Sequence, residues 1–89
     1  MKHTEALEKA IKLLSPRAEV YGDPKDNFRR IADIAKVLLG RDVSEWEVAA
    51  FLLATKLGRI PNDPTYEDSY IDAINYLAFM AEFKDGELK

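Results

Sequence analysis

The chain lacks several features that would point directly to a function. It contains no cysteine, which excludes disulfide bonds and cysteine–zinc sites. Its longest nearly apolar run, Val48 to Thr55, is too short to span a bilayer. No run of Lys or Arg is longer than Arg29-Arg30 and the net charge is −3, so direct DNA binding is not expected. The single histidine, His3, has no obvious acid partner or metal-binding companion, and no residue is predicted to be catalytic.

The length and composition of the chain are those of one small globular domain. The 89 residues are 47% hydrophobic and 33% charged, a balance typical of folded rather than disordered chains. Size scaling predicts that folding buries roughly 64% of the surface of the unfolded chain. Because so small a core leaves little spare stability, we expect one helical domain over residues 1–89 that is stabilised as a homo-oligomer. The N-terminus soon turns amphipathic, which is not the pattern of a signal peptide.

Apolar residues recur at helical spacing in four segments, and no segment alternates as a strand would. We therefore predict an all-α fold, a compact four-helix domain with short loops and helices near residues 4–14, 25–39, 44–57 and 65–83. Ser15-Pro16 is expected to break or kink the first helix, and Gly40 to follow the second in a left-handed conformation. A capping box, Ser44 to Glu47, starts the third helix, which is apolar on every side and is expected to be the most buried.

The fourth segment has two faces that are both partly apolar. At 100° per residue, one face is expected to point to the core and holds Tyr70, Ile71, Ile74, Leu77, Ala78 and Ala81. The roughly opposite face carries three large aromatic residues, Tyr76, Phe79 and Phe83, among Asp68, Asp72 and Asn75. We expect this second face to contact another helix, a second subunit or a ligand.

The turn Tyr21-Gly22-Asp23-Pro24, followed by Asn27, is the first candidate for a ligand site. Backbone amides at the start of a helix can bind an anion, so this turn could hold a phosphate. The structural alternative is a turn whose Asp23 side chain caps the second helix.

The second candidate joins the end of the third helix to the fourth. Lys56 and Arg59 could hold a phosphate, or they could simply complement the helix dipole. Asp68 and Asp72, four residues apart, could share a divalent cation such as Mg²⁺, or they could pair with Lys56 or Arg59. Asn75 adds an amide to the same helix. Our main structural prediction is that this group and the turn at residues 21–24 meet in space.

These segments together resemble a family of small bacteriophage and prophage proteins. The resemblance is carried by Tyr21-Gly22-Asp23-Pro24, Asn27-Phe28, Lys56-Leu57-Gly58-Arg59 and the pattern Asp68-Ser69, Asp72 and Asn75-Tyr76. It implies a phage or prophage origin, an all-helical domain and a location in the cytoplasm of a bacterial host cell. It implies no particular activity.

A more distant resemblance is to the all-α nucleotide pyrophosphohydrolases of the MazG type. That resemblance implies an oligomer in which acidic residues hold Mg²⁺ over a nucleotide triphosphate. Asp68 and Asp72 could stand for the second acidic cluster of those enzymes, whereas their first cluster, EExxE, is missing here. The nucleotide-binding geometry could therefore persist without the chemistry.

The combined prediction is a phage accessory protein that binds without catalysis and acts as an oligomer. Its ligand would be a host factor or a phosphorylated nucleotide; a Mg²⁺-dependent pyrophosphohydrolase and a structural assembly protein are the alternatives. The predicted metal ligands are Asp68 and Asp72. The predicted ligand-binding residues are Tyr21, Asp23, Asn27, Lys56, Arg59, Asp72 and Asn75.

Overall fold

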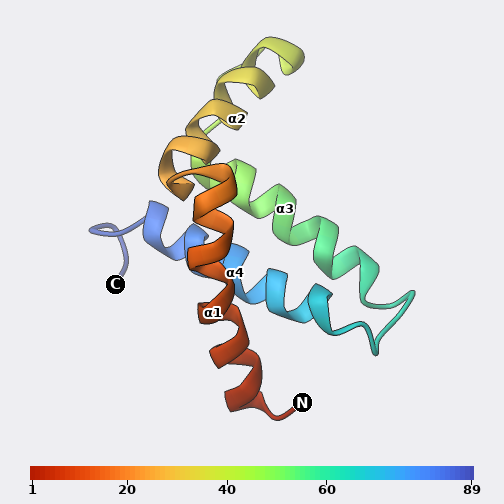
Figure 1. Cartoon of the computed structure of the whole chain (residues 1–89). Helices are drawn as coiled ribbons and strands as arrows, with labels where there is room; N and C mark the ends of the chain where they lie inside the picture. The colour runs from red at the N-terminus through yellow and green to blue at the C-terminus, as the bar shows by residue number, and fades with distance from the viewer.

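Four helices make up the regular structure of the protein (Figure 1). The computed structural model describes all residues from 1 to 89. Its elements are α1 (His3–Tyr21), α2 (Pro24–Leu39), α3 (Glu45–Arg59) and α4 (Glu67–Phe83), with no strand. The predicted all-α fold with four helices and short loops is therefore confirmed. None of the helices is both long enough and apolar enough to cross a membrane.

The helices α3 and α4 form the most extensive helix pair and run side by side in opposite directions (Figure 1). The helix α1 packs across α4, and a two-residue turn then leads into α2, which packs on α3. The C-terminal half of α2 extends beyond the other helices (Figure 1). This arrangement brings the end of α1 and the start of α2 next to the middle of α4.

Local signals account for several of the helix ends. The Ser44 hydroxyl accepts from the Glu47 amide, and the Glu47 side chain accepts from the Ser44 amide, so the predicted capping box is confirmed. Gly40 follows α2 in the left-handed conformation, at φ 71°, as predicted. The third helix runs two residues further than expected, through Gly58 to Arg59.

Of the two outcomes expected at Ser15-Pro16, the break is wrong, because α1 continues through Pro16 to Tyr21, and the kink stays a prediction. A proline inside a helix removes one backbone donor, so the carbonyl of Lys12, four residues earlier, loses its partner. Lys12 and Pro16 are both exposed, and water can hydrogen-bond to that carbonyl. The continuous helix places Arg17 and Tyr21 one turn apart on the same side.

The core is small, and its large residues are aromatic. Phe28 of α2 packs edge-on against Phe79 and Phe83 of α4, with ring centroids 5.3 Å away in both cases. The second face of the fourth helix therefore contacts another helix of the same chain, one of the predicted alternatives. The fully buried apolar residues are Ala10, Phe28, Ala32, Val48, Ala49 and Ile71.

Two predictions about burial are wrong. Leu77, Ala78 and Ala81 of the expected core face of α4 are exposed, whereas Asp72 on the opposite side is buried. Apolar residues occur on nearly every side of α4, so a helical wheel does not show which of the two faces lies in the core. The helix α3 is not buried on every side either: Phe51 is 69% exposed, because α2 and α4 cover only part of its circumference.

Candidate functional site

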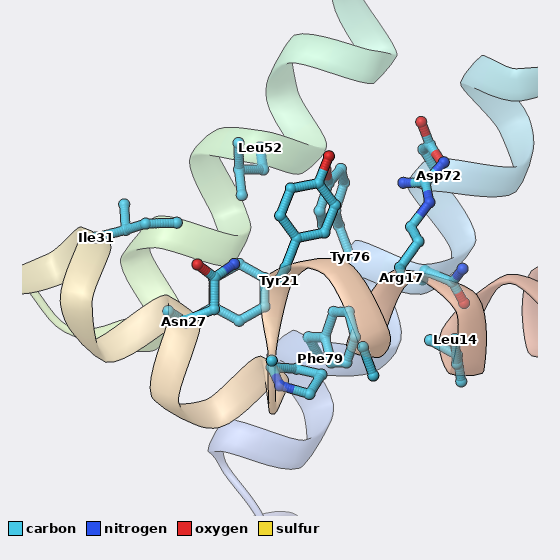
Figure 2. A pocket seen from close by; sticks show the side chains of 14 residues that line it. Leu14, Arg17, Tyr21, Asn27, Ile31, Leu52, Asp72, Tyr76 and Phe79 are labelled. Carbon is cyan, nitrogen blue, oxygen red and sulfur yellow. The ribbon is translucent and has the colours of Figure 1, made fainter.

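A pocket of about 280 Å³ lies where the end of α1 and the start of α2 meet α3 and α4 (Figure 2). Ligand pockets in proteins typically measure about 300–1,000 Å³, so this one suits a small ligand or part of a larger one. The predicted meeting of the two polar segments occurs here in part, since Tyr21 and Asn27 share the lining with Asp72 and Asn75, whereas Arg59 and Asp68 lie outside it. The lining residues are Leu14, Arg17, Ala18, Tyr21, Gly22, Pro24, Asn27, Phe28, Ile31, Leu52, Asp72, Asn75, Tyr76 and Phe79.

The turn between α1 and α2 places Tyr21 and Asn27 at the same end of the pocket. Tyr21 is the last residue of α1, and Gly22 adopts φ 80°, which a residue with a Cβ rarely does. The Asp23 side chain accepts a hydrogen bond from the Lys25 amide at 2.8 Å and so caps α2. Arg30 donates from Nη2 to the Tyr21 carbonyl at 3.3 Å, which ties the turn to α2.

Asp72 is the buried charge of the site, with only 6% of its surface exposed. Its Oδ2 lies 3.0 Å from Nζ of Lys56 on α3, and its Oδ1 lies 3.0 Å from Nη2 of Arg17 on α1. Figure 2 shows the Arg17 guanidinium reaching toward the Asp72 carboxylate. One carboxylate thus joins three helices by its charge, which offsets the cost of removing it from water.

The Oδ1 atom of Asp72 nevertheless has no hydrogen-bond donor. Nη2 of Arg17 is near enough to balance the charge, but its orientation does not satisfy hydrogen-bond geometry, and the oxygen is buried. We therefore treat the contact as an ion pair without a hydrogen bond. A buried acceptor without a donor is rare and costly in folded proteins. Because Oδ1 is buried, an N–H or O–H group of a ligand could reach it only after neighbouring side chains move.

The remaining walls combine amides with aromatic rings. Asn75 donates from Nδ2 to the Ala10 carbonyl at 3.0 Å, which fixes its amide between α4 and α1. Asn27 is half-buried and also lines the pocket. The rings of Tyr21, Tyr76 and Phe79 form further parts of the lining (Figure 2). The arrangement can hold a flat, partly polar molecule between aromatic surfaces.

Four of the predicted site residues line the pocket, and the others do not. Tyr21, Asn27, Asp72 and Asn75 line it. Lys56 lies behind Asp72 and affects the site through their ion pair.

The remaining three predicted residues have their side chains elsewhere. Asp23 serves as the cap of α2, Arg59 is exposed at the end of α3, and Asp68 is exposed and accepts from the Tyr66 hydroxyl at 3.4 Å. The start of α2 is also largely occupied. Pro24 has no N–H, and both the Lys25 and Asn27 amides bond to Asp23, so few amides stay available for an anion.

Sequence reasoning missed Arg17 as a site residue. Arg17 precedes Tyr21 by four residues, so a wheel drawn through Pro16 would have placed both on one side. The expected break in α1 concealed that relationship. The second face predicted on the fourth helix already contained Phe79, whereas Phe28 and Leu52 had no signal of their own, because core residues look the same in a sequence.

The predicted Mg²⁺ site stays a prediction. Asp72 is held between two cations, whereas Asp68 is exposed one turn earlier on α4. No group of three or more His, Cys, Asp or Glu side chains is placed to hold a metal ion.

Comparison with known proteins identifies the family. Residues 5–84 match a family described as a domain of unknown function, DUF6378. The chain belongs to this family. It is also similar to the Gene 55 protein of Mycobacterium phage D29, with 31% identity over 71 residues. The match covers 79% of this chain and 47% of the phage protein, so the chain spans about half the length of that relative. No solved structure matches the chain.

These matches support the predicted relation to phage proteins. The family match covers nearly the whole chain, and the relative comes from a bacteriophage. The resemblance to a phage protein family is thereby confirmed at that level. The four-part motif and the resemblance to MazG-type enzymes stay predictions.

Proposed function

We propose that this phage-related protein is a non-enzymatic binder of a phosphorylated nucleotide, acting in the bacterial cytoplasm. The observation that carries the proposal is the pocket itself, in which aromatic rings and side-chain amides surround the buried Asp72 carboxylate, whose Oδ1 has no hydrogen-bond donor. A nucleobase N–H group can supply that donor once the side chains around Oδ1 move to admit it. The host factor, the pyrophosphohydrolase and the assembly role stay alternatives.

The pocket walls suit a base better than an aliphatic ligand. Tyr21, Tyr76 and Phe79 offer aromatic surface, and base–aromatic stacking contributes about 1–3 kcal/mol per base. The amides of Asn27 and Asn75 add groups that can recognise the edge of a base. A few convergent polar groups in a largely apolar pocket are typical of small-molecule sites.

Arg17 in the pocket wall, and Arg30 beside the lining residues Tyr21 and Gly22, support a phosphorylated rather than a bare base. The Arg17 side chain is nearly half-exposed, so its guanidinium can contact both Asp72 and a ligand. Arg30 is held beside Gly22 by its hydrogen bond to the Tyr21 carbonyl. Guanidinium groups bind phosphate oxygens in a bidentate manner. The proposal thus assigns the phosphate contacts to Arg17 and Arg30 in place of Lys56 and Arg59.

Isothermal titration calorimetry with nucleoside mono- and triphosphates tests the proposal, with inorganic phosphate as the reference ligand. Tyr21→Ala should weaken nucleotide binding about tenfold through lost stacking. Tyr66→Ala is the matched control, because Tyr66 is a similarly exposed tyrosine outside the pocket. Mass spectrometry of the nucleotide after incubation with Mg²⁺ should show no product.

Three results would contradict the proposal. One is that no nucleotide gives a measurable heat of binding. Another is that Tyr21→Ala and Tyr66→Ala lose equal affinity for the nucleotide. The third is conversion of the nucleotide, which would favour the pyrophosphohydrolase.

A further inference from the structure

The helix α1 carries an apolar stripe that the fold leaves open. Leu7, Ile11 and Leu14 are exposed, Ile11 to 67%, although they follow the helical spacing of an apolar face. On the same helix Ala10 is buried, and Ala6 and Leu13 are half-buried. The stripe continues through Ala18 to Tyr21, and no charged residue interrupts it.

The helix α2 carries a second stripe of the same kind. Ile31 is half-buried in the pocket wall, and Ile34 and Leu38 continue from it along the exposed side. Leu38, in the projecting half of the helix, is 79% exposed. The spacing of both stripes alternates four and three residues, which is the pattern of helices that pack along one another.

The two stripes meet at the pocket. Leu14 of α1 and Ile31 of α2 both line it, and from there each stripe runs outward along its own helix. The two stripes therefore come together at the pocket, next to the turn between α1 and α2. Exposed apolar surface of this kind marks interaction sites in soluble proteins.

The chain exposes more surface than a folded monomer of its size should. Its accessible surface is 6614 Å², roughly 1,300 Å² above the approximately 5,300 Å² that size scaling gives for 10.1 kDa. Its radius of gyration is 13.9 Å, against about 12 Å for a compact domain of 89 residues. A stable dimer buries about 800 Å² on each partner, so the excess is enough for one interface.

We propose that a second copy of this chain docks on the α1–α2 surface formed by Leu7, Ile11, Leu14, Ile34 and Leu38. The contact is isologous, with the same stripes on both copies, as in most two-fold dimers. The oligomer predicted from sequence thus uses this surface, while the aromatic face of α4 packs inside the chain. The inference does not depend on the nucleotide, and its experiment contains none.

Sedimentation velocity of the full chain over a wide concentration range tests the proposal. The parent should sediment as a species of twice the 10.1 kDa chain mass. Ile11→Asp and Leu38→Asp, each with a circular dichroism spectrum to confirm folding, should sediment as monomers. Leu77→Asp is the matched control, since Leu77 is exposed on α4 in a separate apolar groove. It should stay dimeric.

A second measurement does not depend on the variants at the interface. Because the chain has no cysteine, Val37→Cys provides a unique site for a spin label beside the α2 stripe. Labelled protein mixed with ¹⁵N-labelled parent should broaden the amide signals of Ile11 and Ile34 in the other copy. A monomeric parent at every concentration, or broadening confined to Leu57 and Leu77, would overturn the proposal.

Discussion

Lys56 of α3 and Asp72 of α4 form an ion pair at the interface of the two helices, with Nζ and Oδ2 3.0 Å apart. Both side chains are largely buried, that of Lys56 to all but 18%. Arg17 adds α1 to the same carboxylate. The group that forms one wall of the pocket therefore also fixes the relative positions of three helices.

Replacing Asp72 with Asn should destabilise the fold. The substitution leaves Lys56 mostly buried without a counter-charge, and breaking such a pair typically costs about 3–5 kcal/mol. Since Arg17 is half-exposed, we expect a loss near the lower end, about 3 kcal/mol, in urea unfolding.

Asp68→Asn is the control, because Asp68 is exposed one turn away, and its effect should stay within about 0.5 kcal/mol. The double variant Lys56→Met/Asp72→Leu should recover much of the loss, since an apolar pair can replace a buried ion pair. An Asp72→Asn protein as stable as the parent would show that the ion pair does not hold the helices together.

The capping box of α3 should make part of the stability depend on pH. A hydrogen bond from Arg41, followed by one from the Ser44 amide, lowers the pKa of the Glu47 carboxyl. A lowered folded-state pKa means that the stabilisation is complete above the ordinary glutamate pKa of about 4.3 and is lost as the pH falls through the folded-state value. Urea unfolding should therefore show that the parent is more stable than Glu47→Gln at neutral pH.

The two proteins should converge in acid, once the carboxyl of Glu47 is protonated in the folded state. A difference that persists unchanged there would mean that the charge of Glu47 does not contribute. Ser44→Ala, which removes the other half of the box, should cost about 1 kcal/mol at either pH.

Two glycines near helix ends should respond to alanine in opposite directions. Gly40 has φ 71°, where a Cβ is strained, so Gly40→Ala should destabilise the protein by about 1–2 kcal/mol. Gly58 lies inside α3, and a methyl group at this position would point into open space, so Gly58→Ala should stabilise by about 0.5–1 kcal/mol. Thermal unfolding of both variants measures the difference. A stabilising Gly40→Ala would contradict the left-handed end of α2.

The sequence was most informative where the signal and its effect lie within a few residues. Ser44 and Glu47 predict the start of α3, and Gly40 predicts the end of α2, because each acts on the backbone beside it. The four helices and their order follow from spacing alone. Pro16 misled the prediction because an exposed helix tolerates one missing backbone hydrogen bond.

Packing was harder to predict, because it depends on residues that are distant in sequence. Nothing near Asp72 shows that Arg17 and Lys56 will both reach it. The helix α4 is apolar on most sides. Which side faces the core depends on packing against Phe28 of α2, and a helical wheel of α4 does not include that residue. The pocket was anticipated only as a meeting of two polar segments, and its aromatic walls come from the core.

The side-chain amides of the protein offer the most direct test of nucleotide binding. The chain has three asparagines and no glutamine, so three pairs of side-chain NH₂ signals appear in a ¹H–¹⁵N spectrum. Asn27 and Asn75 line the pocket, whereas Asn62 lies in the loop between α3 and α4. Titration with a nucleoside monophosphate should shift the Asn27 and Asn75 signals and leave Asn62 in place. No shift at Asn27 and Asn75 at saturating nucleotide, or a shift at Asn62 alone, would contradict the pocket as the binding site.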